Sequence, residues 1–244
     1  MNTLVIRDPG PLTTVQDLGR VGYLCVGIPG SGPMDEAAFV LGNRLVGNPD
    51  GAAGLECTLI GPRIEFTDER AVAVTGAAMP VDVNGSERPR WQSFRVSAGD
   101  VLKVGPARAG VRAYVAIAGG VATPLALGSR ATYLRGHLGG LGGRALKRND
   151  ELPLGVARPA PLQRVRDERV PDDAGEPEIR VVLGPQADRF TERGIAAFLG
   201  SSYEMLPHTL TTGITPWWIV KLAMKWSLSG SAVMFPLSYC HGHM

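Results

Sequence analysis

The sequence predicts a mainly β protein, built as a barrel or sandwich of short strands with a few short helices. Short apolar runs alternate with turn residues along the first 120 positions, and the 32 glycines and 19 prolines among 244 residues are typical of strands joined by turns. The regular strand–helix–strand alternation of a parallel sheet is absent. Apolar residues make up 44% of the chain, which is enough for a sizeable core.

The predicted strands follow one another at close spacing. The first apolar run is followed by Asp8, Pro9 and Gly10, which favour a turn. Later, Asn84 and Gly85 form the strongest short signal for a hairpin. Together these turn signals predict a barrel or sandwich. The expected strands lie at 3–6, 71–75, 79–83, 91–96, 101–104 and 111–120.

Two helices are expected. The first covers residues 33–46, because Pro33 suits the first helical position, Asp35 falls in the first turn and Gly47 closes the segment. The second is expected near 186–199. Its apolar positions predict a buried side that is formed by Phe190, Ile195 and Phe198.

Composition divides the chain into four parts. Residues 1–155 hold the strand-rich pattern, and 156–178 are rich in Pro, Arg and Asp, which predicts a linker or crossing segment. Residues 179–206 are expected to begin a second subdomain. Residues 207–244 form an atypical tail.

The tail contains no Asp or Glu but holds three of the four Trp. A membrane segment is not expected there, because Lys221 and Lys225 would each cost roughly 2.5–3.5 kcal/mol at the bilayer centre. We interpret the tail as a truncated or frameshifted end of the chain. A native amphipathic segment is the alternative.

Charge and cysteine content narrow the function classes. The net charge is +2 and no basic run is interleaved with aromatics, so we expect no nucleic-acid partner. Cys25, Cys57 and Cys240 are odd in number and far apart, which argues against a disulfide framework or a zinc site, and we expect no metal. The apolar run within the first ten residues is too short for a signal peptide, and charged residues follow it too soon. We therefore expect a cytoplasmic protein.

A stretch at residues 13–35 is dense in groups that bind ligands. Gln16, Asp17 and Arg20 precede the start of the expected helix, where unpaired N–H groups can bind an anion or a polarised carbonyl. Arg suits a carboxylate and Asp or Gln suits an amide N–H, so the stretch fits a small polar substrate. In the alternative interpretation, Asp17 and Arg20 form a structural pair in a loop that Gly and Pro shape.

Four other residues have two interpretations each. Glu56 lies in an apolar strand, where it is either buried with a raised pKa or directed outward. Arg112 and Tyr114 share one face of a strand, which lines a site or faces water. His137 lies in a glycine-rich loop and is either a general base or a solvated side chain.

Several motifs in sequence order resemble one known family. They are "TTVQDLGRVGY", "GIPGSGPMD", "LECTLIGP", "AGDVLKV", "RAYVAIAGG" and "GGRALKRNDEL", and the similarity covers roughly residues 4–154. The chain resembles the family of the 5-oxoprolinase C subunit, the KipI antagonist and carboxyltransferase subdomains A and B of urea carboxylase. The resemblance implies two cyclophilin-like β-barrel subdomains. The second is expected to be incomplete, because the chain departs from the family pattern after "SSYEM".

The resemblance implies ATP-dependent opening of 5-oxo-L-proline to L-glutamate, performed with the KipI-like B subunit and the A subunit of 5-oxoprolinase. No GxxxxGK[ST] phosphate loop is present, so ATP is expected to be handled with a partner, and this chain alone is expected to be inactive. The expected catalytic residues are Asp17, Arg20 and Asp35. The expected substrate-binding residues are Gln16, Ser31, Met34 and Glu56.

Two alternatives remain open. One is the carboxyltransferase component of a biotin-dependent carboxylase acting on urea or a similar amide, although no Ala-Met-Lys-Met biotinylation motif occurs here. The other is a regulatory protein that binds a KipI-like kinase inhibitor. The neighbouring reading frames would distinguish the three functions. Genes for the A and B subunits would favour 5-oxoprolinase, a gene for a biotin carboxylase would favour the carboxyltransferase, and a gene for a kinase inhibitor would favour the regulatory protein.

Overall fold

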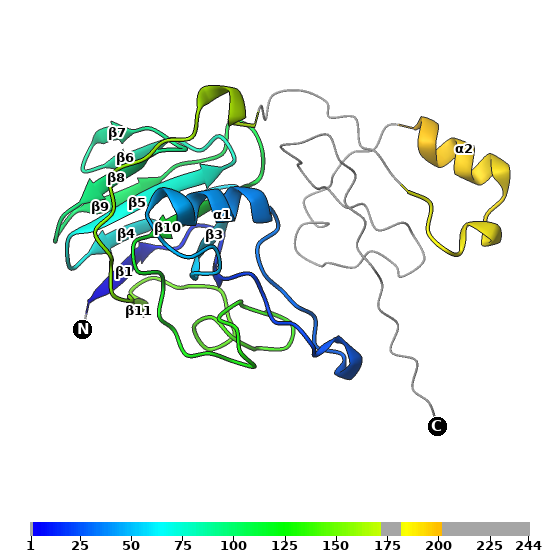
Figure 1. Ribbon diagram of the computed structural model, residues 1–244, viewed down its shortest axis with the longest axis horizontal. Coiled ribbons are helices and arrows are strands. Elements are labelled where there is room, and N and C mark those ends of the chain that lie inside the picture. The colour runs from blue at the N-terminus through cyan, green and yellow to red at the C-terminus, as the bar shows by residue number, and fades with distance from the viewer. Residues whose placement is uncertain (1, 172–181, 202–244) are drawn as a thin grey trace. The chain divides into compact units, whose positions relative to one another are not determined.

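The computed structural model describes residues 2–171 and 182–201 of the chain (Figure 1). The described residues fall into two compact units, one that holds 2–171 and one that holds 182–201. The first unit contains eleven strands and helix α1 (Glu36–Leu45), and the second contains helix α2 (Glu192–Gly200). The strands are β1 (Thr3–Asp8), β2 (Leu12–Gln16), β3 (Gly54–Thr58), β4 (Arg63–Phe66), β5 (Arg70–Gly76), β6 (Val81–Val83), β7 (Ser86–Arg88), β8 (Ser93–Val96), β9 (Val101–Val104), β10 (Arg112–Ile117) and β11 (Glu151–Pro153).

The strands form two antiparallel sheets. The six-stranded sheet has the order β11-β1-β4-β9-β6-β7 and the five-stranded sheet has the order β2-β3-β10-β5-β8. In the five-stranded sheet, β10 lies between β3 and β5, with Tyr114 opposite both Glu56 and Thr75. This register brings the middle of β10 beside the middle of β3, so Tyr114 and Glu56 are neighbours.

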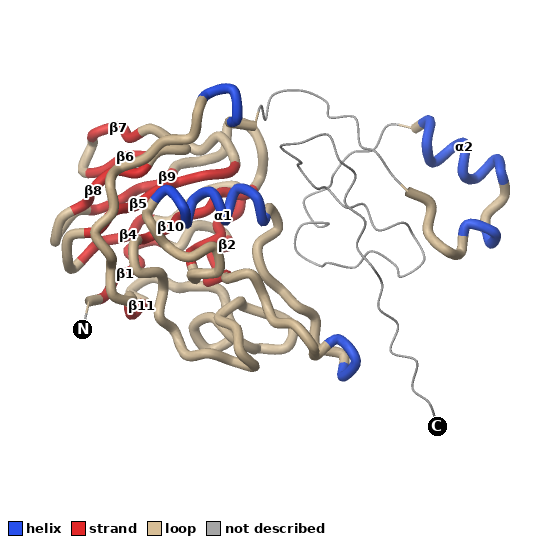
Figure 2. The backbone as a smooth tube through the Cα atoms, in the orientation of Figure 1, coloured by secondary structure: helices blue, strands red, loops and turns tan. Residues whose placement is uncertain are grey.

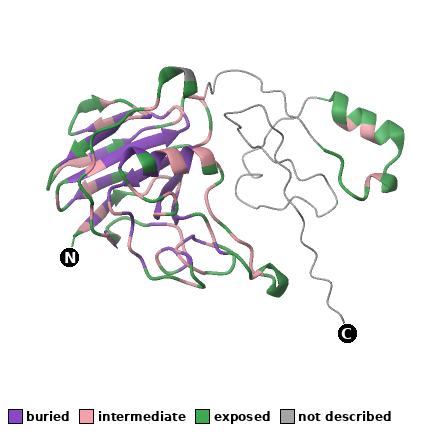
Figure 3. Ribbon diagram, in the orientation of Figure 1, coloured by how far each residue is buried: buried purple, intermediate pink, exposed green. Residues whose placement is uncertain are grey.

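Apolar side chains from both sheets form one large core, and the strands that carry them are mostly buried (Figure 3). Leu4 and Ile6 on β1 alternate with more exposed neighbours, as expected of a strand with one buried face. Strand β3 is instead buried along its whole length. Because side chains from both sheets form one cluster, each sheet needs the other to bury its apolar face.

Helix α1 packs on the five-stranded sheet against β5 and β10. Phe39 contacts Tyr114 edge-to-face, with ring centroids 5.9 Å apart and an interplanar angle of 81°. Gly42 permits the close approach, because a Cβ there would lie 3.0 Å from the Thr75 hydroxyl. The Thr75 hydroxyl also donates to the carbonyl of Ala38 over 2.7 Å. The helix is therefore fixed over the strand that carries Tyr114.

The mainly β prediction is confirmed, and several boundaries are corrected. Helix α1 begins at Glu36, so Pro33 lies before the helix and not at its first position, and Asp35 is the N-cap. Gln16 lies in strand β2, because its backbone pairs with β3, and not in a loop. The second expected helix is divided into a 3₁₀ turn, Ala187–Arg189, and α2.

Further 3₁₀ turns lie at Leu24–Val26 and Asp167–Arg169, and the rest of the 17–35 segment is irregular up to α1 (Figure 2). In the second unit, Phe190 is 44% exposed, and α2 has no fully buried residue among those described. Of the expected buried side, Ile195 and Phe198 are half-buried and Phe190 is exposed. Of the expected second subdomain at 179–206, only 182–201 are described, and the tail from 207 lies outside the described residues.

Within residues 156–171, where we expected a linker or crossing segment, Gln163 and Val165 bind strand β8 and the residue Trp91 that precedes it. Gln163 accepts from the backbone N–H of Ser93 over 2.8 Å, and Val165 donates to Trp91 over 2.9 Å. In the part of the chain that is described, no helix is long and apolar enough to cross a membrane.

Candidate functional site

The start of helix α1 is the first place where sequence-predicted site residues meet. Asp35 has an extended backbone, and its carboxylate accepts from the N–H of Ala38 over 3.0 Å, as an N-cap does. Burial raises the pKa of Asp35, and the hydrogen bonds from the backbone of Ala38 and Ala37 oppose this rise. The carboxyl therefore combines a capping role with a proton affinity above its ordinary value.

Glu56 on β3 is buried beside this helix start. Its Oε2 accepts from the N–H of Met34 over 2.8 Å, and its Oε1 pairs with Arg112 of β10 over 2.5 Å. The Glu56 side chain is only 6% exposed, so of its two interpretations the structure shows the buried one. Such a buried pair carries a large desolvation cost, and its main effect here is to fix the geometry of the segment before α1.

Tyr114 completes this group, which we call the α1 cluster: Met34, Asp35, Glu56, Arg112 and Tyr114. The Tyr114 hydroxyl accepts from the N–H of Asp35 over 2.7 Å. Burial, and then the nearby Glu56 carboxylate, raise the pKa of Tyr114 far above its usual range, so the hydroxyl keeps its proton. The N–H groups of Met34 and Asp35, just before the helix, are thus bound by Glu56 and Tyr114, and the Ala38 N–H in its first turn is bound by the Asp35 carboxylate, so these groups do not remain for a substrate.

Asp17 lies in a second group of contacts. Its Oδ1 accepts from the Gly19 N–H over 2.9 Å and from the Ser129 hydroxyl over 2.6 Å, while Oδ2 accepts from the N–H of Arg130. Asp17 does not pair with Arg20, because no ion pair joins them among the described residues. Its carboxylate instead ties the segment after β2 to the segment near 130.

Arg20 belongs to the same group. Its guanidinium donates to the carbonyls of Ala131 and Ala126 and to the hydroxyl of Ser31. The residue is 4% exposed, so it is a buried cation whose partners are neutral oxygens. We call this second group the Asp17 cluster: Asp17, Arg20, Ser31, Ser129, Arg130 and Ala131.

Gln16 lies beside the Asp17 cluster on β2. Its Nε2 donates to the hydroxyl of Thr14 over 3.0 Å and to the carbonyl of Thr132 over 3.4 Å. Its Oε1 is buried and has no partner among the described residues. An unsatisfied buried acceptor costs free energy, so this oxygen destabilises the folded state of the described chain.

The structure therefore divides six of the seven expected site residues between two clusters, and the seventh, Gln16, lies beside the Asp17 cluster. Met34, Asp35 and Glu56 join the α1 cluster, while Asp17, Arg20 and Ser31 join the other. No hydrogen bond between described side chains links the two clusters. The roles of these residues as catalytic or substrate-binding groups remain predictions.

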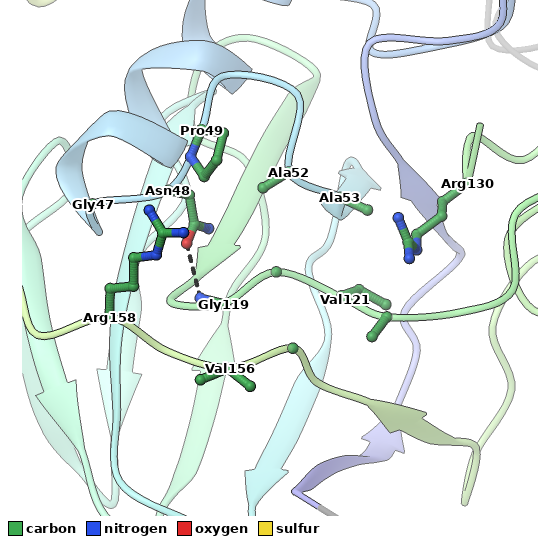
Figure 4. Close-up of a pocket in the computed structure, with 13 residues that line it drawn as sticks. Gly47, Asn48, Pro49, Ala52, Ala53, Gly119, Val121, Arg130, Val156 and Arg158 are labelled. Atoms are coloured by element: carbon green, nitrogen blue, oxygen red, sulfur yellow. Dashed lines mark hydrogen bonds between the residues drawn. The ribbon is translucent and has the colours of Figure 1, made fainter. Parts of the chain in front are cut away.

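Sequence reasoning missed Ser129, Arg130 and Ala131. No periodicity or spacing in the sequence marks them as partners of Asp17 and Arg20. Arg130 also lines a cavity of about 320 Å³ that lies between the turn after α1 and the segments 119–122 and 155–158 (Figure 4). None of the seven expected site residues lines it.

A metal site is not formed by the described residues, since no group of three His, Cys, Asp or Glu side chains comes together there. Cys57 is buried, and burial raises the pKa of its thiol to about 12. Cys25 is exposed. His137 takes a left-handed backbone with φ of 49° in the glycine-rich loop.

Known proteins match this chain over most of its length. The family of carboxyltransferase domains, subdomain A and B, matches residues 26–215. A urea amidolyase of Lachancea kluyveri is 45% identical over 150 residues, which are 61% of this chain and 8% of that protein. The C subunit of 5-oxoprolinase from Escherichia coli is 34% identical over 204 residues, which are 83% of this chain and 64% of that protein.

The solved structure of the K. lactis urea amidolyase matches with a TM-score of 0.67 and 39% identity, covering 71% of this chain and 11% of that one. This chain thus spans less than two thirds of each of these three relatives. The family match covers well over half of the residues. The protein belongs to the family of carboxyltransferase domains, subdomains A and B.

Proposed function

We propose that this chain is the C subunit of an ATP-dependent 5-oxoprolinase, which opens 5-oxo-L-proline to L-glutamate together with a KipI-like B subunit and an A subunit. One observation carries the proposal: similarity to the C subunit of 5-oxoprolinase continues over 83% of this chain, beyond the 61% that the urea amidolyase match covers. A five-membered lactam is a stable amide, so its opening requires coupling to ATP.

The α1 cluster supplies the group that we assign to the lactam. Asp35 is held at its backbone by Tyr114 and carries a carboxyl with a raised pKa, so it binds a proton more tightly than an ordinary carboxyl, which suits the acceptance and return of an amide proton. Glu56 and Arg112 act as positioning residues, because they fix the segment before α1 through Met34.

The glycine-rich loop at 139–145 does not fit the phosphates of ATP. The GxGxxA match at 139–145 lies outside any strand–loop–helix unit, and a Cβ at Gly143 would collide with the backbone carbonyl of His137. The loop is therefore packed on itself and offers no open cradle for phosphates. We assign ATP to the partner proteins of the complex, and no step on this chain passes through it.

A second candidate is the carboxyltransferase component of a biotin-dependent urea carboxylase. The higher identity of 45% to a urea amidolyase favours this candidate, although over fewer residues. In that case the biotin carrier lies elsewhere. A regulatory role in binding a KipI-like inhibitor is the third alternative.

Reconstitution tests the proposal. The A and B subunits are mixed with this full chain, and 5-oxoproline-dependent release of ADP and L-glutamate is measured; we expect activity from the three together and none from this chain alone. In a parallel arm, transfer of the carboxyl group from carboxybiotin to urea, which yields biotin and N-carboxyurea, is measured with this chain. Activity only in the second arm would favour the second candidate, and binding of the KipI-like protein without either activity would favour the regulatory role.

Asp35→Asn tests the site within the same assay. Asn retains a side-chain oxygen for the helix cap but cannot take up a proton, so we expect kcat to fall at least about tenfold with a small change in KM. The matched control is Asp50→Asn, which removes a surface carboxylate that pairs with Arg44. Equal kinetics of both variants would remove Asp35 from the proposed chemistry.

A further inference from the structure

The cavity beside the turn after α1 has features that the proposed function does not use. Its volume is about 320 Å³, at the lower end of small-molecule sites. Arg130 and Arg158 lie on opposite sides of the view in Figure 4, and both line the cavity. Small residues form much of the rest of its wall, among them Gly119, Gly120 and Gly155.

Neither guanidinium at this cavity forms an ion pair within the described residues. None of the described lining residues is acidic. Arg130 donates from Nε to the carbonyl of Thr123 over 2.7 Å, which fixes one edge of the guanidinium. No described carboxylate pairs with Arg130 or Arg158, in contrast to Arg144, which pairs with Asp150 over 2.7 Å. Two permanent cations thus face one small space.

Part of the cavity wall is a closely packed backbone, in which the N–H groups of Gly119 and Gly155 are bound within the chain. A Cβ at Gly119 would lie 2.5 Å from the carbonyl oxygen of Gly155, so no side chain can fill this position. The Gly119 N–H donates to Asn48 Oδ1 over 2.8 Å, and the Gly155 N–H donates to Gly120 over 2.9 Å. The guanidiniums of Arg130 and Arg158 add charged donors to this lining.

Asp17 fixes the position of Arg130. One carboxylate oxygen accepts from the backbone N–H of Arg130, and the other accepts from the hydroxyl of Ser129 over 2.6 Å. Asp17 does not line the cavity itself. The backbone of Arg130 is therefore held by Asp17 while its side chain reaches the cavity (Figure 4).

We propose that this cavity binds a small anion through carboxylate or phosphoryl oxygens, which Arg130 and Arg158 contact, and that Asp17 is a positioning residue for Arg130. Guanidinium groups bind both kinds of oxygen with charge-assisted hydrogen bonds. The binding site stands on this geometry alone and does not depend on the reaction of the complex.

Calorimetric titration of the full chain at constant ionic strength tests the site. The probes are inorganic phosphate and succinate, which separate a phosphoryl from a carboxylate ligand. We expect saturable binding of at least one probe at one site per chain. Arg130→Gln and Arg158→Gln should each weaken it about tenfold or more, because each removes a charge-assisted contact. Arg63→Gln, an exposed arginine on β4, is the matched control and should leave the affinity unchanged.

A double variant tests the role of Asp17. Asp17→Asn should weaken binding in the parent chain but have no further effect in the Arg130→Gln background, because it acts through Arg130. A purely structural role would lower the affinity equally in both backgrounds and would overturn the positioning assignment. No saturable binding of either probe up to about 10 mM, or an affinity within twofold of the parent for both arginine variants, would overturn the site itself.

Discussion

Two charged residues in the "QDLGR" sequence have a different role from the ion pair that their spacing allowed. Asp17 and Arg20 each bind groups more than 100 positions away, Asp17 at Ser129 and Arg20 at Ala131. Both are buried. A buried charge without an opposite partner is costly unless hydrogen bonds satisfy it, and these two residues are satisfied mainly by backbone and hydroxyl groups.

Arg20→Ala should therefore lower stability. The substitution leaves the carbonyl of Ala131 and the hydroxyl of Ser31 without their charged donor, and we expect a loss of about 2–4 kcal/mol in the free energy of unfolding. Urea denaturation measures it. Arg63→Ala, on the exposed side of β4, is the control and should stay within about 0.5 kcal/mol of the parent. An equally small effect of Arg20→Ala would show that its contacts contribute little.

The pH dependence of stability should report the burial of Asp35. Its folded pKa is raised above the ordinary value of 3.8, so the folded state binds the proton more tightly than the unfolded state. The resulting stability is present below about pH 3.8 and is lost as pH rises through the folded pKa. Asp35→Asn keeps the cap and lacks this titration.

Urea midpoints of both proteins between about pH 3 and pH 7 measure this difference. The stability of the parent relative to Asp35→Asn should fall with rising pH and then become constant, while the other carboxylates cancel in the comparison. A relative stability that rises over this range would mean that hydrogen bonding from Ala38 outweighs burial.

At the scale of elements, strands with a local signal could be predicted and strands without one could not. The strands at 71–75 and 79–83 matched β5 and β6, because apolar alternation and the Asn84-Gly85 turn are local. Strand β11 has three residues and pairs with β1 almost 150 positions earlier, so it leaves no local pattern. Strand β2 was hidden in a segment rich in polar residues.

The candidate site, too, could be predicted only where its residues carry a local sequence signal. The helix start with Asp35 could be found from capping chemistry, and Glu56 from an unusual charge in an apolar strand. Their connection depends on the pairing of β3 with β10, which places Tyr114 opposite Glu56. A register between strands almost 60 positions apart is set by packing of the whole sheet and not by local sequence.

Two glycines allow backbone strain and steric contact to be separated. Gly85 in the β6–β7 turn and Gly119 have nearly equal φ, 86° and 89°. A Cβ at Gly85 meets nothing within 4 Å, whereas at Gly119 it lies 2.5 Å from the Gly155 oxygen. Gly85→Ala should cost about 1–2 kcal/mol from the left-handed backbone alone. Gly119→Ala should cost clearly more, as measured by urea denaturation, and equal costs would show that the backbone near Gly155 can shift.

At the scale of the molecule, the first unit depends on contacts that close its chain from both ends. Strand β1 pairs with β11, so the beginning and end of residues 3–153 lie in the same sheet. Residues 156–171 then extend beside β8 and cover Trp91 through Val165. This arrangement predicts that residues 2–171 form one cooperative unit that includes the segment after β11.

Two fragments test this unit. The fragment 1–171 should unfold in one transition, because it holds the core that both sheets share. The fragment 1–155 lacks Gln163, which binds Ser93 of β8, and Val165, which binds Trp91 just before β8. Without these residues Trp91 becomes exposed. We expect it to be less stable by about 2–4 kcal/mol, from two or more hydrogen bonds and the burial of Val165.

Trp91 is the only tryptophan in either fragment, so its fluorescence during urea titration reports this region. Equal urea midpoints would show that the segment after β11 lies on the unit without stabilising it, and two separate transitions in 1–171 would show that the two sheets do not fold as one.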